Sequence, residues 1–302
     1  MRAVISTRST CLALAACLAS GSARAHGEAT HAANIPWTFD AWVTVPLALS
    51  ALWYAAGWWH LRSRGHTASY DGATYFFSGW VVLAAALVTP LHAAGERSFA
   101  AHMFEHELLM LVAAPLLVLS RPLGIALWAF PYAVRHSLVV GGRMLLSGAW
   151  RFLTAPIVAT LLQAATLWLW HAPRLFDLAL AHSGWHVVQH VSFLVSALLF
   201  WWAMLCGRTL GRVGISVGCL FFTATVSGAL GALMAFSSSP WYAGYTASQL
   251  DAFGLTPAED QQLAGLLMWV PGGLVHAGAG LALLARRLRQ SDGGRRMRWN
   301  NS

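Results

Sequence analysis

Charged residues are scarce in this chain of 302 residues: they make up 10% of it, against 57% hydrophobic residues. A soluble domain carries about a quarter charged residues, so this composition excludes an ordinary soluble domain and predicts a membrane protein. Lysine is absent, and all 19 basic residues are arginines. A formal net charge of +8 alone is compatible with nucleic acid, but the arginines lie between apolar runs and form no single patch. We therefore expect no nucleic-acid partner.

Cysteine is also rare, and its four positions form no metal-binding or disulfide pattern. Cys11 and Cys17 lie near the N-terminus, and Cys206 and Cys219 lie near the ends of two predicted spans. Without a CxxC motif, the sequence supports neither a thiol-based metal chaperone nor a disulfide scaffold. The P-loop, GxSxG, HExxH and dinucleotide-binding motifs are missing too. We therefore predict a protein that is not an enzyme.

The first residues have the pattern of a cleavable signal peptide, 1–25. Arg2 and Arg8 precede the apolar stretch CLALAACLAS, and the Ala-Arg-Ala of residues 23–25 fits a cleavage site. The alternative is an uncleaved first helix. Cleavage leaves a short periplasmic N-terminal tail, 26–40, in which HGEATH holds His26 and His31. This tail is either a disordered terminus or a flexible metal-binding segment.

Apolar runs of about 20 residues predict membrane-spanning helices, because a helix satisfies its own backbone hydrogen bonds in lipid. We predict an all-α, polytopic membrane helix bundle with seven transmembrane helices after the signal peptide. This domain covers 41–285 and is followed by a basic cytoplasmic tail, 286–302. Two longer loops, 121–151 and 237–261, separate spans, and LGIALWAFPY in the first loop is expected to lie in the membrane interface. The predicted spans are 41–60, 73–91, 102–120, 152–172, 186–206, 214–236 and 262–284.

The arginines set the expected orientation of these spans. Beyond the signal peptide, all of them except Arg97 and Arg174 fall on one side when the loops are assigned alternately. Because cytoplasmic loops are enriched in basic residues, that side is expected to be cytoplasmic. The protein is then a multi-pass protein of the inner membrane, with its mature N-terminus in the periplasm and its C-terminus in the cytoplasm. Most acidic residues and histidines fall on the opposite, outer side.

Two histidine pairs mark the outer ends of spans three and five. His102 and His106 in HMFEH are four residues apart, so they share one helix face, and Met110 extends the same stripe by a turn. His186 and His190 repeat this spacing, whereas Gly184 is expected to put His182 out of line. Imidazole and thioether groups are ligands for copper and for haem iron. The alternative for these histidines is a set of hydrogen bonds between helices.

Three further residues are candidate ligands at greater depth or at a helix end. His171 ends span four, where Pro173 stops the helix. Met268 and His276 lie in span seven on either side of Pro271. Near the middle of the membrane, His276 must face the bundle interior and find a partner. Each of these residues also has a purely structural explanation, as a helix end or as part of helix packing.

At these motifs the sequence resembles the CtaG-type assembly factors associated with caa3-type cytochrome c oxidases, which are multi-span bacterial membrane proteins. The resemblance rests on HMFEH followed by APLL, WHAPRLFDLAL, HVVQHVSFL ahead of LLFWW, and DQQLAGLLMWVPGG, in this order over about residues 100–285. It implies a role in maturation of the haem–copper oxidase through copper delivery. It also implies that five histidines match the histidine positions of that family, namely His102, His106, His171, His186 and His190.

Two hypotheses follow. In the first, the protein is a membrane assembly factor for the oxidase that binds copper through outer-facing histidines and helps deliver it. The expected partners are then the lipid bilayer, cytochrome c oxidase subunits and periplasmic copper carriers. In the second, it is a b-type haem-binding membrane redox or haem-handling protein, since paired histidines on facing helices ligate haem. The i, i+4 stacking fits a metal ion better, because one haem takes one histidine from each helix. A scaffold whose histidines only bond to each other is the third reading.

Overall fold

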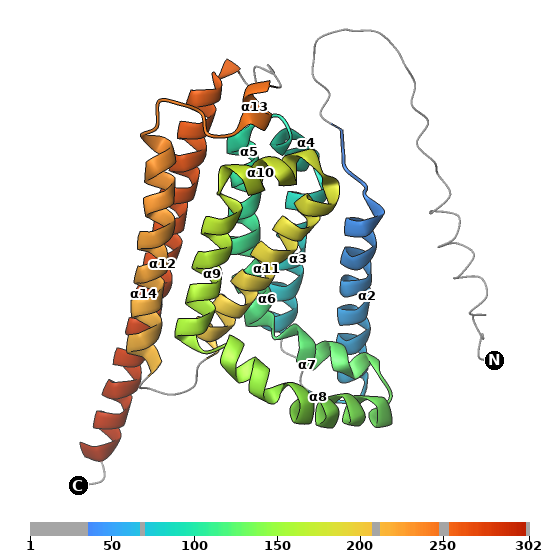
Figure 1. The fold of residues 1–302 in the computed structure, drawn as a ribbon. Helices are drawn as coiled ribbons and strands as arrows, with labels where there is room; N and C mark the ends of the chain where they lie inside the picture. The colour runs from blue at the N-terminus through green and yellow to red at the C-terminus, as the bar shows by residue number, and fades with distance from the viewer. Residues whose placement is uncertain (1–35, 67–69, 207–211, 248–253, 300–302) are drawn as a thin grey trace, which may run out of the picture. The chain divides into compact units, whose positions relative to one another are not determined.

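The computed structural model describes residues 36–66, 70–206, 212–247 and 254–299, and every regular element among them is a helix. The predicted signal peptide, 1–25, and His26 and His31 of the predicted N-terminal tail lie outside these residues. The described residues belong to one compact unit, residues 35–302 (Figure 1). The elements are α2 (Ala41–Ser63), α3 (Tyr70–Val88), α4 (Pro90–Gly95), α5 (Phe99–Glu107), the π-helix η1 (Leu108–Ala113), α6 (Ala114–Ser120), α7 (Pro122–Ala126), the 3-10 helix η2 (Leu127–Ala129), α8 (Tyr132–Leu153), α9 (Pro156–Trp170), α10 (Pro173–Ala181), α11 (Ser183–Leu205), α12 (Arg212–Ala235), α13 (Ala243–Ala247) and α14 (Pro257–Trp299).

Each of the seven predicted spans is largely helical, and the span 102–120 comprises α5, η1 and α6. Successive long helices run in alternate directions (Figure 1). Five helices are long and apolar enough to cross a membrane, and a sixth span is possible if α8 and α9 form one bent span. The all-helical membrane class is therefore confirmed, with five to six candidate spans, and α2 is helical although it lies outside those five. The seventh span remains a prediction.

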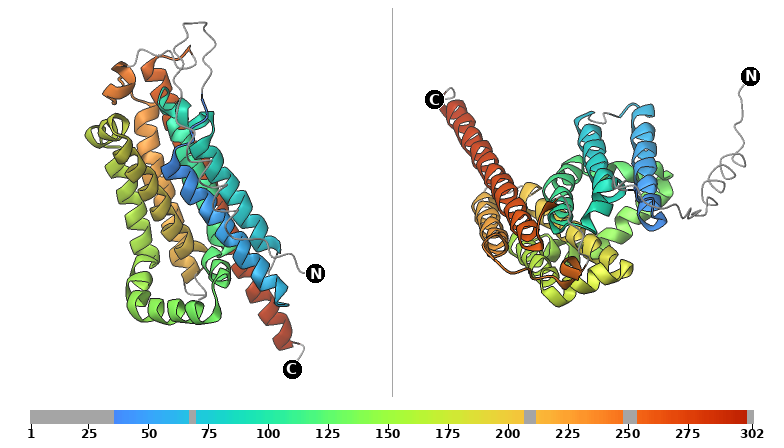
Figure 2. Two further views of the ribbon diagram at one scale, coloured as in Figure 1. Left: turned by 90° about the vertical axis from the view of Figure 1, so that its right-hand side faces the viewer. Right: turned by 90° about the horizontal axis from the view of Figure 1, so that it is seen from above.

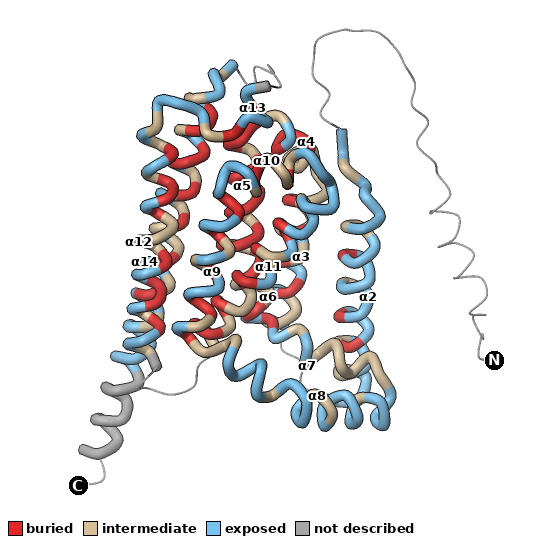
Figure 3. Tube along the Cα trace, viewed as in Figure 1, coloured by how far each residue is buried: buried red, intermediate tan, exposed pale blue. Residues whose placement is uncertain are grey.

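The first predicted loop, 121–151, is wrong as a loop, because α7, η2 and most of α8 occupy it. α8 lies at one end of the bundle and meets α9 at an angle of 70° (Figure 1). It has no buried residue along its length (Figure 3). Arg135 lies over the ring of Trp128 in η2, 3.7 Å from its centroid, and so holds the start of α8 against the preceding turn. Arginines dilute the apolar content of α8, so a search for long apolar runs does not find it.

The second half of the chain forms the tighter side of the bundle, where α12 and α14 lie along each other (Figure 2). Glycine makes this contact possible: a Cβ on Gly231 would lie 2.7 Å from the carbonyl oxygen of Gly265. Small residues let two membrane helices approach closely. Gly231, in the segment SGALGAL of α12, therefore makes a close contact with Gly265 of α14. α14 also continues past the predicted end of span seven, because its arginines and leucines favour helix.

The π-helix η1 interrupts the long helix that begins with HMFEH. Pro115 lacks an N–H, so the preceding turn cannot be closed by a regular hydrogen bond. The carbonyl oxygen of Met110, five residues earlier, instead accepts a hydrogen bond of 2.8 Å from the indole of Trp201 in α11. A π-helix places more residues in each turn than an α-helix does. Residues after Glu107 therefore leave the helix face that His102 and His106 share.

Candidate metal centre

The first turn of α5 is held by a carboxylate from α14. Asp260 Oδ1 accepts hydrogen bonds from Ser98 Oγ at 2.7 Å and from the Ala100 N–H at 3.2 Å, and its Oδ2 accepts from the Phe99 N–H at 2.6 Å. The first N–H groups of a helix have no partner within it, and negative charge is favourable there. Asp260 therefore fixes the start of α5, and with it the direction of His102 in the next turn.

The two histidine pairs predicted from their spacing meet in space. The rings of His102 and His106 on α5 lie 4.4 Å apart, and those of His186 and His190 on α11 also lie 4.4 Å apart. Across the helix interface, His102 lies 5.2 Å from His186, and His106 lies 4.9 Å from His190, centroid to centroid. We call these four residues the histidine cluster. The helix α5 and the start of α11, which carry it, lie at the end of the bundle opposite α8 (Figure 1).

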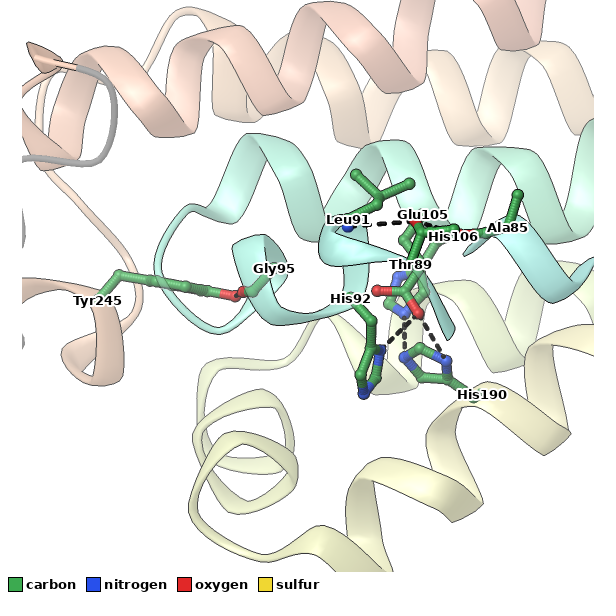
Figure 4. Close-up of polar contacts among 9 residues, drawn as sticks. All are labelled: Ala85, Thr89, Leu91, His92, Gly95, Glu105, His106, His190 and Tyr245. Atoms are coloured by element: carbon green, nitrogen blue, oxygen red, sulfur yellow. Dashed lines mark hydrogen bonds and ion pairs between the residues drawn. The ribbon is translucent and has the colours of Figure 1, made fainter. Parts of the chain in front are cut away.

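Glu105 and His92 extend the cluster, as Figure 4 shows. Glu105 Oε1 accepts a hydrogen bond of 2.8 Å from Nδ1 of His92 in α4, and it lies 3.4 Å from Nδ1 of His190. Burial by itself lowers the pKa of His92, but the hydrogen bond and charge of Glu105 outweigh burial and raise this pKa above its usual value. The carboxylate favours a proton on His190 Nδ1, so His190 Nε2 is left with its lone pair.

The free nitrogens of the cluster point at one another. His190 Nε2 lies 3.3 Å from His106 Nε2, and one ring nitrogen each of His102, His106 and His190 lies within 4.8 Å of the other two. His102 and His106 are each 1% exposed. His106 Nδ1 and His186 Nε2 are buried without a hydrogen-bond partner among the described residues, which is costly for polar atoms. This arrangement fits a metal ion held by three neutral imidazoles and oriented by Glu105.

His171 lies beside the cluster but pairs with a different residue. Its Nε2 is 3.3 Å from the sulfur of Met103, and its Nδ1 donates to the carbonyl oxygen of Leu167 at 2.7 Å. Met103 directly follows His102 in the chain, so its side chain leaves α5 toward α9 rather than toward α11. The structure thus places this predicted ligand in a separate contact of imidazole and thioether.

Met110, His276 and Met268 lie away from the cluster. Met110 and His276 line a cavity of about 20 Å³ deeper in the bundle, together with Glu107 and Gln163. The sulfur of Met110 accepts a hydrogen bond from Gln163 at 3.5 Å, and His276 Nδ1 donates to the carbonyl oxygen of Gly272 at 2.6 Å while its ring stacks on Trp201. His276 therefore has the interior partner that its position demands. Met268 is buried in the main hydrophobic core.

A cavity of about 860 Å³ opens beside the cluster, between α2, α3, α10 and α11. One wall carries His92, His186 and His190, and leucine and valine side chains form much of the rest. Three carboxylates, Asp40, Glu96 and Asp177, also line this cavity. Carboxylates raise the local concentration of cations. The cavity therefore brings three carboxylates and three histidines to the walls of one space.

Sequence reasoning missed three residues of this site, His92, Glu105 and Met103. Glu105 and Met103 stand inside the HMFEH motif, so their place between the two histidines was a signal. His92 carries no such signal, because it belongs to neither histidine pair in the sequence and reaches the cluster only through the packing of α4. His182, expected to be out of line, is exposed between α10 and α11.

Comparison with known proteins agrees with the motifs that carry these residues. Two curated relatives, from Mycobacterium bovis and Mycobacterium tuberculosis, are both described as uncharacterized and are each 28% identical to this chain over 245 residues. The alignment covers 77% of this chain and 36% of each relative, so the chain spans little more than a third of their length. No solved structure matches the chain. A family model described as cytochrome c oxidase caa3 assembly factor matches residues 52–290, and the chain therefore belongs to this family.

Proposed function

We propose that this membrane protein binds copper in the histidine cluster and delivers it to cytochrome c oxidase during assembly. The role is that of a carrier without catalysis, in line with the assembly factor family to which the chain belongs. The observation that carries the proposal is the convergence of three buried imidazoles, from His102, His106 and His190, whose ring nitrogens lie within 4.8 Å of one another.

The donor set favours copper among the metals of biology. Neutral imidazole suits copper, and copper stands at the top of the affinity order for divalent ions of the first transition row. Burial keeps these imidazoles neutral, which is the state that binds metal. Glu105 supports the proposal in a second way, because a carboxylate hydrogen-bonded to a ligating histidine fixes its orientation and strengthens it as a ligand. His186 stands at the rim, where it is placed to receive the ion first.

The cavity and its carboxylates suggest the path by which copper would enter the site. Copper would arrive through the opening lined by Asp40, Glu96 and Asp177 and reach His186 and His190 before the inner nitrogens. From the arginine distribution we expect this end of the bundle to lie in the periplasm, so periplasmic copper carriers and the copper-receiving oxidase subunit would dock there. Four predicted ligands lie outside the cluster and are not required for this first step, namely His171, Met110, Met268 and His276.

Copper analysis of purified protein tests the proposal. We expect the double variant His102→Ala, His106→Ala to lose the copper that the unchanged protein retains, because it removes two of three converging ligands. His182→Ala is the matched control, since His182 lies at the same end but is exposed. Retention of the full copper content by the double variant would reject the site. Deletion of the protein should lower the copper content of the isolated oxidase and leave its haem unchanged.

Haem is a second candidate ligand, favoured by the large cavity. A volume of about 860 Å³ with mostly apolar walls lies within the range of small-molecule sites, about 300–1,000 Å³. Either His186 or His190, which lie on one wall of this cavity, would supply one ligand to the iron. The visible absorption spectrum separates the two candidates, because a haem protein shows a Soret band that shifts on reduction. A colourless protein that binds copper rejects the haem alternative.

A further inference from the structure

The contact between His171 and Met103 lies outside the histidine cluster and has an unusual donor arrangement. His171 Nδ1 lies 2.7 Å from the carbonyl oxygen of Leu167, and a carbonyl oxygen only accepts hydrogen bonds. The proton of the neutral ring is therefore on Nδ1. Nε2 then carries a lone pair, and it points at the sulfur of Met103 from 3.3 Å. Thioether sulfur also only accepts, so no proton joins the two atoms.

Burial excludes the simplest way to satisfy this contact. A protonated His171 would donate from Nε2 to the sulfur, but the residue is 3% exposed and Met103 is 1% exposed. No carboxylate pairs with His171 among the described residues, so a buried imidazolium would be left uncompensated. Sulfur packed against a ring edge is a common core contact. Here, however, the lone pair of the ring, rather than a C–H edge, faces the sulfur.

We propose that His171 and Met103 form a second copper site, specific for Cu(I) and adjacent to the histidine cluster. One imidazole nitrogen and one thioether sulfur are soft, neutral ligands, and thioether favours Cu(I) over harder ions. A monovalent ion with neutral ligands brings a single charge into the apolar surroundings, which costs less than a divalent one. The inference rests on the proposed function, because it takes copper as the cargo of the protein.

Two aromatic rings connect the second site to the cluster. The ring of Phe176 lies 5.3 Å from His102 and 6.3 Å from His171, centroid to centroid. The ring of Phe193 lies 4.6 Å from His106 and 6.2 Å from His171. The two sites therefore share walls and are served by consecutive residues of α5. This arrangement suits transfer of reduced copper from a nitrogen-only site to a site that contains sulfur.

The position of His171 is fixed by its neighbours. It follows the last residue of α9, and the hydroxyl of Tyr242 donates a hydrogen bond of 3.1 Å to its carbonyl oxygen. Pro173 begins α10 two residues later, so the chain turns after His171. A ligand held on both sides in this way keeps its Nε2 pointed at Met103 without further rearrangement.

X-ray absorption at the copper edge of the Cu(I)-loaded, selenomethionine-labelled protein tests the second site. We expect a copper–selenium scattering path in the unchanged chain, which separates methionine from cysteine as the source of sulfur. This path should disappear in Met103→Leu, together with one copper ion per chain. Met234→Leu is the matched control, since Met234 is equally buried in α12, and the path should persist there. Leucine replaces methionine at nearly constant volume, so both variants should fold.

The outcomes distinguish this inference from the proposed function. Copper bound only through nitrogen or oxygen in the unchanged protein would overturn the second site and leave the cluster standing. A copper–selenium path that survives in Met103→Leu would overturn the assignment to Met103. A path that survives in the double variant His102→Ala, His106→Ala, with the copper content otherwise unchanged, would reject the cluster and support the second site.

Discussion

Glu105 contacts two imidazoles that come from different helices, His92 of α4 and His190 of α11. Its Oε1 accepts a hydrogen bond from His92 Nδ1 and lies 3.4 Å from His190 Nδ1. One carboxylate therefore favours one tautomer of His190 and a proton on His92. A carboxylate does this better than an amide, because it accepts from both sides and carries the charge that compensates a bound cation.

Glu105→Gln should therefore weaken copper binding without removing a ligand. The amide keeps the size of the side chain, but it loses the charge and turns a donor toward one of the histidines. Loss of an outer-shell partner costs about 10–100-fold in metal affinity, and we expect a decrease in this range. Competition with a chelator of known copper affinity measures it. Asp71→Asn is the control, because Asp71 lies in the first turn of α3, at the end of the bundle away from the histidine cluster. This variant should leave the copper affinity unchanged. Equal affinities in both variants would show that Glu105 does not orient the site.

Residue-level prediction from the sequence succeeded where regular helix spacing holds. The three residues between His102 and His106 are α-helical, so the pair shares a face, and the same is true of His186 and His190. Met110 lies outside the predicted stripe because it falls in the π-helix η1, which precedes Pro115. His92 joins the site through tertiary packing of α4, which no local spacing encodes. The contacts of Glu105 and Met103 could not be predicted from the sequence, because their partners come from α4, α11 and the end of α9.

Helices as elements were predictable wherever they are uniformly apolar. The seven predicted runs coincide with α2, α3, the α5–η1–α6 segment, α9, α11, α12 and α14, because apolar length is the physical requirement for crossing lipid. A search for long apolar runs does not find α8, whose arginines suit a helix at the membrane surface. It also misses α4, α10 and α13, which are too short to produce an apolar run. These short helices nevertheless cover the end of the bundle that carries the histidines (Figure 1).

The packing of α12 on α14 predicts opposite effects for the same substitution at two glycines of one helix. In Gly231→Ala the new Cβ would lie 2.7 Å from the carbonyl oxygen of Gly265 and 3.1 Å from Cβ of Trp269, so the helices must separate. Overpacking of this kind costs about 1–3 kcal/mol of unfolding free energy. In Gly218→Ala the Cβ meets nothing within 4 Å, and alanine favours helix over glycine by about 1 kcal/mol.

Thermal unfolding in detergent measures this difference. We expect a lower transition temperature for Gly231→Ala and an equal or higher one for Gly218→Ala. The closeness of α12 and α14 matters beyond stability, because α14 carries Asp260, which holds the start of α5. Equal transition temperatures for both variants would show that the contact at Gly231 is loose enough to absorb a methyl group.

At the scale of the whole molecule, most arginines among the described residues lie at the end of the bundle opposite the histidine cluster, and Arg97 and Arg174 are the exceptions. Arg62 lies in the last turn of α2, and Arg121 follows α6. Arg135, Arg143 and Arg151 lie along α8, at the end of the bundle opposite α5 (Figure 1). Such a separation is what the membrane potential and the insertion machinery select for topology. It also keeps like charge away from a site that must accept a cation. The arginine distribution thus bears both on the orientation in the membrane and on the binding of a cation at the histidine cluster.

Cysteine labelling in intact cells tests this orientation, in a background whose native cysteines are replaced by alanine. Ser238→Cys places a thiol in the exposed segment between α12 and α13, at the histidine end, and Ser63→Cys places one beside Arg62 at the other end. A membrane-impermeant maleimide should react with the first thiol in intact cells and with the second only after permeabilisation. The reverse pattern would put the cluster in the cytoplasm, and copper would then have to reach it from inside. With the expected pattern, copper reaches the cluster from the periplasm and never has to cross the arginine-lined end.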